Sequence, residues 1–245
     1  MAPKFKPQRH RVTLTGRRHL TPDILELGFQ LEGGEKLEFE AGQFVNVYIP
    51  REEERPAIRA YSIASPLDDP ERLVICLDTD AGDGIGVSYL KGLDIGDQIT
   101  IKGPVGIFKI REDDPHDILI ACHVSALGMC LAMAEAALRL SGSRRVTLVH
   151  ALKPSGGAYY VDELRELART YDRFHPVLTL PGGGPHWRGP TTSLVDEVTR
   201  RLENRPTTTL YLCGLGPMVT ELSEAARKLG LPKDRIVAEK WSKAA

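Results

Sequence analysis

The chain has 245 residues, of which 42% are hydrophobic and 27% are charged, a balance typical of a globular protein with one large domain or two smaller ones. Its 32 basic and 33 acidic side chains give a formal net charge of -1 at pH 7, which argues against a nucleic-acid-binding protein. The apolar runs are a handful of residues long, whereas a membrane helix needs about 20. The composition therefore predicts a protein without a membrane span.

The N-terminus and the cysteines indicate the compartment. Residues 1–10 carry charge but lack the apolar core of a signal peptide. The four cysteines, at positions 76, 122, 130 and 213, include no Cys-x-x-Cys pair. That spacing argues against a zinc site, an iron–sulfur site and a disulfide framework. We expect free thiols, no bound metal and a cytoplasmic protein.

The first 110 residues read as short strands separated by turns. Residues 44–49 (FVNVYI) alternate apolar and polar, the period of a strand with one buried face. Similar runs recur with Gly, Pro or Asp between them, at residues 11–15, 24–30, 59–64, 72–77 and 98–102. Regular short strands with such turns predict an antiparallel β-barrel or sandwich.

From residue 117 onward, strands alternate with helices. Residues 118–121 (ILIA) form a continuous apolar run, typical of a strand covered on both faces. Further strands are expected at residues 146–152, 176–180, 209–213 and 236–239. Between them, apolar residues at three- and four-residue steps predict helices, as at Leu127, Leu131, Ala134 and Leu138. This alternation predicts an α/β, Rossmann-like domain with a parallel sheet.

The polar residues 111–116 separate the two patterns. The predicted domains are therefore an antiparallel β-barrel over residues 1–112 and a parallel-sheet α/β domain over residues 113–245. Open parallel sheets bind ligands at the carboxyl ends of their strands. A two-ligand enzyme is consistent with this architecture, but the architecture alone does not establish one.

The tetrapeptide Arg59-Ala60-Tyr61-Ser62 suggests a ligand site on the barrel. On a strand, Arg59 and Tyr61 point to one face. A guanidinium and an aromatic plate at that spacing can hold a phosphate and stack on a flat ring of the same ligand. Ser62 adds a hydroxyl that can donate to a ring nitrogen. The alternative interpretation is an ordinary half-exposed strand.

One segment precedes this tetrapeptide and several others follow it in a fixed order. They are residues 41–44 (AGQF), 84–90 (GIGVSYL), 96–97 (GD), 103–106 (GPVG), 213–218 (CGLGPM) and 238–241 (AEKW). Taken in order, they resemble the ferredoxin–NADP reductase superfamily, and the bacterial ferredoxin/flavodoxin–NADP reductases most closely. The resemblance runs from about residue 11 to residue 241. It implies an FAD-binding barrel followed by an NAD(P)-binding domain.

Carried onto this chain, the resemblance implies an FAD site on the barrel. Arg59 would pair with the FAD pyrophosphate, Tyr61 would stack on the isoalloxazine, and Ser62 would lie near the hydride-accepting nitrogen. The other positions implied to contact FAD are Ala60, Cys76, Leu77, Gly86, Val87 and Ser88. Of these, the last three would offer backbone N–H groups and a hydroxyl to phosphate. The alternative for residues 84–88 is an ordinary loop that ends in a helix N-cap at Ser88.

The resemblance also implies residues around the nicotinamide. Trp241 would cover the opposite flavin face, and Cys213 would border the nicotinamide ring. The alternatives are an aromatic residue packed on the last strand and a buried strand cysteine. The residues implied for catalysis are Ser62, Cys213 and Glu239. Ser125 and Lys153 are implied to bind the nucleotide.

The nucleotide loop departs from the family pattern. The family usually has Gly-Thr-Gly-x-x-Pro here, whereas residues 124–129 read VSALGM. Val124 places a β-branched side chain where glycine permits unusual torsions and close approach of a phosphate. Lys153 offers a point charge to a 2′-phosphate without a bidentate fork. The positions where relatives often carry arginines read Leu180 and Pro190 here, and Arg188 is the nearest substitute in the sequence. His123 is interpreted as a structural histidine. We expect FAD binding to be better supported than tight NADPH binding.

The leading hypothesis is an FAD-dependent oxidoreductase that transfers electrons between NAD(P)H and a one-electron carrier protein, a ferredoxin or flavodoxin. The basic residues near the N-terminus would dock an acidic carrier, although a solvated fringe explains them as well; they are Lys4, Lys6, Arg9, Arg11, Arg17 and Arg18. The alternative is a flavin-binding electron-transfer or assembly subunit with weak or no NAD(P)H turnover. A remnant that has lost both ligands is a third possibility.

Overall fold

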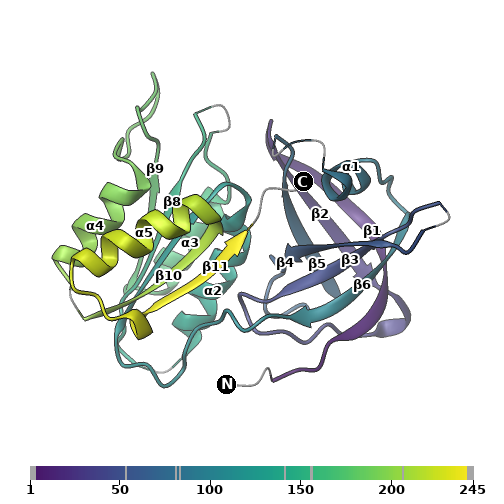
Figure 1. The fold of residues 1–245 in the computed structure, drawn as a ribbon, viewed down its shortest axis with the longest axis horizontal. Helices are drawn as coiled ribbons and strands as arrows, with labels where there is room; N and C mark the ends of the chain where they lie inside the picture. The colour runs from purple at the N-terminus through teal and green to yellow at the C-terminus, as the bar shows by residue number, and fades with distance from the viewer. Residues whose placement is uncertain are drawn as a thin grey trace. The chain divides into compact units, whose positions relative to one another are not determined.

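The computed structural model describes residues 4–52, 54–80, 82, 84–140, 142–154, 157–205 and 207–241. The chain divides into two units, one ending at Lys109 and the other with its described part running from Ile110 to Trp241 (Figure 1). Within the described residues, no helix combines the length and the apolar character that crossing a membrane requires.

The first unit is a six-stranded antiparallel sheet in the order β4-β3-β6-β1-β2-β5. Its strands are β1 (Gln8–Thr21), β2 (Ile24–Leu31), β3 (Phe44–Ile49), β4 (Ala57–Ser62), β5 (Arg72–Asp78) and β6 (Gln98–Val105). The period-two pattern works as expected in β3, where Val45, Val47 and Ile49 are buried in the core. The predicted antiparallel strands are confirmed.

The two edge strands of this sheet meet, so the sheet curls into a barrel. The backbone N–H of Ala64, just after β4, donates to the carbonyl of Val74 in β5 at 2.9 Å. The N–H of Val74 donates in turn to Ser65 Oγ at 2.8 Å. These bonds satisfy edge groups that an open sheet would leave exposed. They also bring the end of β4 next to β5.

In this unit, the sequence analysis gave a helix near residues 84–88 only as the alternative interpretation, with its N-cap at Ser88. Helix α1 (Ile85–Lys91) follows the glycine at position 84 and packs the fully buried Leu90 into the barrel core. Its seven residues are too few to display a helical period. The helix begins inside the segment that the sequence analysis assigned to phosphate binding.

The second unit is a five-stranded parallel sheet in the order β11-β10-β7-β8-β9. The strands are β7 (Asp117–His123), β8 (Val146–Ala151), β9 (Phe174–Thr179), β10 (Thr208–Leu215) and β11 (Ile236–Trp241). The helices between them are α2 (Leu127–Arg139), α3 (Val161–Thr170), α4 (Leu194–Glu203) and α5 (Gly216–Lys228). The predicted α/β Rossmann-like class is confirmed.

The strand order reverses between β7 and β10. The chain moves outward from β7 to β8 and β9, then returns to β10 and moves outward on the other side to β11. Because such crossovers are right-handed, α2 and α3 cover one face and α4 and α5 the other, as the nucleotide unit of Figure 1 shows. The carboxyl ends of β7 and β10 therefore flank the topological switch point, where open α/β sheets bind ligands.

Strand β9 begins earlier than expected. The sequence predicts residues 176–180, but the strand runs from Phe174 to Thr179 and includes Pro176. A proline lacks the N–H that a central strand needs, and β9 is an edge strand that tolerates it.

Candidate functional site

The side chains of Arg59 and Tyr61 lie on one face of β4, as the sequence predicts. Across the β3–β4 ladder they are paired with Val47 and Val45, which belong to the barrel core. Both are half-buried, whereas Ile58 on the other face is 47% exposed. Burial raises the pKa of Tyr61 to about 12, against a small opposing effect of Arg59, so the phenol stays neutral. This edge of the barrel therefore presents a guanidinium beside an uncharged aromatic plate.

Helix α1 comes so close to this pair that any Cβ at position 86 would require the Tyr61 side chain to shift. A Cβ on Gly86 would collide with Tyr61 Oη and would lie 3.0 Å from Arg59 Cγ. The backbone N–H groups of residues 85–87 belong to the first helical turn and have no acceptor within the helix. A guanidinium, an aromatic ring and free amide donors thus meet at one place.

Of the groups that Ser88 could offer to a phosphate, the structure leaves the side-chain hydroxyl and not the backbone N–H. The position before α1 is Gly84, not Ser88, and Ser88 lies inside the helix. Its backbone N–H donates to the carbonyl of Gly84 at 3.0 Å, so that N–H is not available to a phosphate. The same finding excludes the alternative of an N-cap at Ser88. The Ser88 side chain is exposed.

The remaining predicted flavin residues lie at the end of β4 and on β5. Ser62 is the last residue of β4 and is half-buried, and Ala60 is exposed. Leu77 is 2% exposed and packs in the barrel core, so only its backbone can face a ligand. Cys76 points to the opposite face of β5 and is partly exposed.

In the nucleotide unit, four ionisable side chains form a row across the carboxyl half of the sheet. His150, Cys122, Cys213 and Glu239 are register neighbours on adjacent strands. His150 Nδ1 lies 3.4 Å from Cys122 Sγ. Burial, helped by nearby His123, lowers the pKa of His150 to about 3, so its ring is neutral. Burial also raises the pKa of both thiols in the row.

Cys213 is fully buried and is in contact with Cys130 of α2. The Cys130 side chain hydrogen-bonds both Cys122 and Cys213. Beside Cys213 in the row, Glu239 is half-buried, and burial raises the pKa of its carboxyl group. Glu239 is therefore the more accessible of the two groups predicted to act near the nicotinamide.

The loop after β7 adopts the backbone shape that glycine favours. Val124 has φ +55°, in the left-handed region that a β-branched residue rarely occupies. Its carbonyl accepts a hydrogen bond from Tyr159 Oη, and Tyr159 packs edge-on against His150 with ring centroids 5.6 Å apart. The side chain of Val124 is 7% exposed. Burial and the tyrosine together hold the strained residue in place.

The other predicted nucleotide residues also lie at the carboxyl ends of strands. Ser125 is partly exposed in the loop after β7, Lys153 follows β8, and Trp241 ends β11 beside Leu215. Gly214, at the end of β10, has φ +149°, and a Cβ there would lie 2.8 Å from Met218 Cε. These residues surround the switch point of the sheet.

The sequence analysis missed the supporting role of Tyr159. It lies 35 residues after Val124, within a tyrosine pair that no motif connects to the loop. Periodicity reports which face of an element is buried, but it does not report which distant hydroxyl reaches a given carbonyl. The buried thiol cluster was likewise recorded only as separate cysteines.

Comparison with known proteins gives two adjoining family matches. The model of the oxidoreductase FAD-binding domain matches residues 11–110, and the model of the oxidoreductase NAD-binding domain matches residues 125–224. The ferredoxin–NADP reductase B of Sorangium cellulosum (strain So ce56) is 32% identical over 235 residues, which cover 93% of this chain and 96% of that protein.

Reductases of oxygenase systems are also similar. The reductase component of propane 2-monooxygenase from Rhodococcus jostii (strain RHA1) is 26% identical over 95% of this chain, which spans 63% of that protein. Among solved structures, the Amycolatopsis cytochrome P450 reductase GcoB superposes with a TM-score of 0.83 and 25% identity, covering 98% of this chain and 71% of that one.

The strain at Val124 gives a prediction about stability. Val124→Ala removes buried methyl groups but keeps a Cβ in the left-handed conformation, so we expect the free energy of unfolding to fall by about 2 kcal/mol. Val124→Gly removes more apolar surface but also relieves about 1–2 kcal/mol of backbone strain. The glycine variant should therefore be the more stable of the two in urea unfolding.

A matched control is the fully buried Val149 of β8, where no positive φ is involved. There the glycine variant should be less stable than the alanine variant by about 1 kcal/mol. If Val124 shows the same order as Val149, the strain does not exist in solution.

The neutral His150 predicts a pH dependence. The unfolded chain takes up a proton on this histidine below about pH 6.5, whereas the folded chain does so only near the lowered pKa of about 3. The stability that His150 contributes is complete above pH 6.5 and is lost as the pH falls towards 3. Between pH 6.5 and 4.5, wild type should lose about 2 kcal/mol more than His150→Gln in urea unfolding. His186→Gln, an exposed histidine, should leave the wild-type slope unchanged.

Proposed function

The chain belongs to the ferredoxin–NADP reductase superfamily, and from this we propose that it passes electrons from NAD(P)H, through FAD, to a ferredoxin or flavodoxin. It is an FAD-dependent oxidoreductase with NAD(P)H as co-substrate. The carrier is taken from the relatives whose names include ferredoxin, among them the ferredoxin–NADP reductase B of Sorangium cellulosum.

The residues of the barrel fit FAD. The observation that best supports this is the close approach of helix α1 to Arg59 and Tyr61. The backbone at Gly86 lies so near these two side chains that a Cβ there would collide with Tyr61 Oη. Arg59 and the N–H groups of residues 85–87 would hold the pyrophosphate, since charge-assisted bonds and amide donors suit that anion. Tyr61 would pack against the isoalloxazine, and Ser62 would lie near the reactive edge of the ring. The backbone around Cys76 and Leu77 would line the site.

The residues that would hold the nucleotide gather at the switch point of the parallel sheet. Ser125 and the backbone of its loop would contact the phosphates, because the loop keeps a left-handed residue at Val124. Lys153 would offer one charge to a 2′-phosphate, which favours NADPH only modestly. Glu239 and Trp241, on the last strand, would be the side chains nearest the nicotinamide.

Bound FAD would supply the chemistry that links two-electron hydride transfer from the nicotinamide to one-electron transfer to the carrier. The protein's contribution would be to orient the two rings. At the nucleotide edge His150, Cys122 and Cys213 are neutral, whereas, against the effect of burial, hydrogen bonds from the two thiols lower the pKa of Cys130 to about 5. Glu239, whose pKa is raised by burial, can hold a proton there more readily than an exposed carboxylate.

We also propose that the carrier protein is acidic and docks on the basic residues near the N-terminus. Of the basic residues near the N-terminus, several already have local partners. Arg18 donates to Glu26 at 3.2 Å, Arg17 donates to the carbonyl of Leu93 at 2.9 Å, and Arg9 stacks over the ring of Tyr48. Exposed charges with weak local pairs still contribute to long-range attraction, so docking of an acidic carrier would be sensitive to salt.

Substitutions on the barrel test the FAD site. Arg59→Ala should weaken FAD binding roughly 10- to 100-fold, because charge-assisted hydrogen bonds are worth about 1.5–3 kcal/mol. Tyr61→Ala should weaken it by about tenfold, whereas Tyr61→Phe should retain it because the stacking plate remains. Gly86→Ala should weaken FAD binding, and Tyr61→Phe should restore part of the loss by removing the colliding hydroxyl. The readout is flavin fluorescence quenching on titration of the apoprotein.

Arg18→Ala serves as the control, since Arg18 lies on β1 and pairs with Glu26. It should bind FAD as wild type does. Unchanged FAD affinity in both Arg59→Ala and Tyr61→Ala would contradict the assignment of this site.

The complete function is tested by anaerobic titration of the purified flavoprotein with NADH and NADPH. Either nucleotide should bleach the flavin absorbance, and adding oxidised ferredoxin should restore it at a rate that falls as salt rises. Lys153→Gln should weaken NADPH about five- to tenfold and NADH little, with Lys228→Gln as the control. A flavin that stays oxidised with both nucleotides would instead identify an electron-transfer or assembly subunit.

A further inference from the structure

The face of the parallel sheet under α4 changes from apolar to polar along the strands. Alternate residues of β7, β8 and β9 point to this face. In the carboxyl half, Ala121, Val149 and Val177 pack with the apolar side of α4. Towards the amino ends, the residues on the same face include Thr147 and His175, which are register partners. This face of the sheet is therefore apolar enough to pack against a helix only in its carboxyl half.

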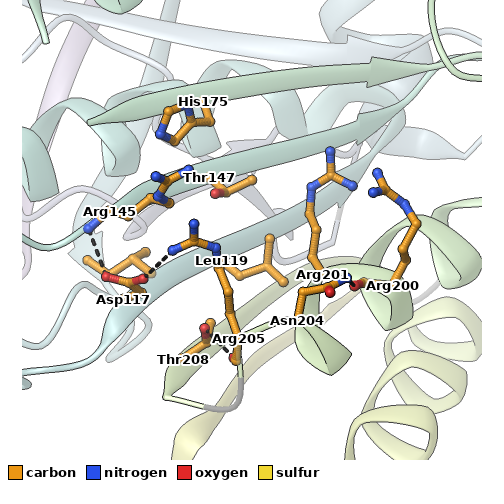
Figure 2. Close-up of a pocket in the computed structure, with 11 residues that line it drawn as sticks. Asp117, Leu119, Arg145, Thr147, His175, Arg200, Arg201, Asn204, Arg205 and Thr208 are labelled. Carbon is orange, nitrogen blue, oxygen red and sulfur yellow. Dashed lines mark hydrogen bonds and ion pairs between the residues drawn. The ribbon is translucent and has the colours of Figure 1, made fainter. Parts of the chain in front are cut away.

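Helix α4 ends at Glu203, so the polar part of the face stays uncovered. The space left there is a cavity of about 400 Å³ at the amino ends of the strands. Its polar lining residues are Asp117, Arg145, Thr147, His175, Arg200, Arg201, Asn204, Arg205 and Thr208 (Figure 2). We call it the amino-edge pocket. It lies about 20 Å from the carboxyl edge, because β7 spans seven residues.

The pocket holds more positive than negative charge. Asp117 accepts from Arg205 Nη1 at 3.0 Å and from the backbone N–H of Arg145 at 2.9 Å. Glu197, which is 2% exposed, pairs with Arg200 at 2.8 Å and with Arg201. Two carboxylates thus face four arginines.

Arg145 supplies the charge that these carboxylates do not neutralise. Within the described part of the chain, its guanidinium has no ion pair, and Figure 2 shows it beside His175 and Thr147. Burial, followed by Arg145 and Arg205, lowers the pKa of His175. Two guanidiniums acting on one half-buried ring indicate a positive potential inside the cavity. The sequence analysis did not detect this set, because its members are spread from residue 117 to residue 208.

From this arrangement we propose that the amino-edge pocket is a second ligand site, which binds the phosphate group of a small organic phosphate. Arg145 supplies the main ion pair, and Arg201 and Arg205 add positive charge around it. The Thr147 hydroxyl and the second N–H of the Asn204 amide, whose other N–H donates to the carbonyl of Arg200 at 2.7 Å, match the several oxygens of a tetrahedral dianion better than the two of a carboxylate. The Thr208 hydroxyl is not among these donors, because it donates to the carbonyl of Arg205 at 2.9 Å. A volume of about 400 Å³ holds a compact phosphorylated molecule.

The site is independent of electron transfer as proposed above. Its residues lie at the amino ends of the strands, whereas the nucleotide residues lie at the carboxyl ends. A variant that loses phosphate binding here should still be reduced by NAD(P)H. Failure of either proposal therefore leaves the other standing.

The experiment is calorimetric titration of the flavoprotein with inorganic phosphate, with glucose 6-phosphate and with glucose. Both phosphates should bind wild type, and glucose should not. Arg145→Gln should raise the dissociation constant at least tenfold, and Arg145→Lys should raise it by a smaller factor, because a point charge replaces a fork. Tighter binding of glucose 6-phosphate than of inorganic phosphate identifies an organic phosphate site, and the reverse order identifies a site for free phosphate.

Two control variants locate the binding. Arg169→Gln, an exposed arginine on α3, should bind phosphate as wild type does. Lys153→Gln should also bind normally, and a loss there with no change in Arg145→Gln would place the phosphate at the nucleotide edge and overturn the proposal. Equal affinity in wild type and Arg145→Gln would overturn it as well. The proposal would also be overturned if Arg145→Gln bound phosphate as wild type does but transferred electrons to the ferredoxin more slowly. The pocket would then contribute to binding of the carrier protein.

Discussion

Parallel pairing of β7 with β10 is the constraint on which the nucleotide unit depends. It makes Cys122 and Cys213 neighbours and sets the loops after both strands side by side at one edge of the sheet. Because all five strands run the same way, every carboxyl end meets at that edge and every amino end at the opposite one. Side chains far apart in the chain, such as Lys153 and Trp241, are gathered without any local motif.

The two edges that this pairing creates differ in charge. At the carboxyl edge, burial keeps His150 and the thiols of Cys122 and Cys213 uncharged. At the amino edge, arginines outnumber the carboxylates that pair with them. One edge suits the transfer of a hydride between flat rings, and the other suits an anion.

Most of the fold could be predicted from the sequence, because strands with one buried face and amphipathic helices each have apolar residues at a regular spacing. The alternation in residues 44–49 and the apolar run at 118–121 both became strands. Helix α1 was given only as an alternative and with its start four residues late, because it is short and begins among glycines. The early start of β9 was missed because Pro176 is acceptable only where the strand is an edge, and that position is a property of the whole sheet.

The candidate site could be predicted where its residues are close together in the sequence. It could not be predicted where the contacts join residues that are far apart in the sequence. Arg59 and Tyr61 share a face because they are two positions apart on a strand. The glycine-like backbone of Val124 follows from its place in the loop, but its support by Tyr159 does not. The bonding of Ser88 to Gly84 depended on where the helix began, and helix ends are the least certain part of a sequence-based assignment.

Helix α4 has a further consequence for how proteins of this architecture can diverge. The open end of the sheet exists because the helix stops at Glu203, and one extra turn adds about 5.4 Å of cover. A chain whose fourth helix is longer by one or two turns would roof over that end and bury the positions held here by Arg145 and His175. Those positions would then have to become apolar, since an unpaired guanidinium cannot be enclosed without a partner. Helix length and the charge of the strand ends should therefore change together.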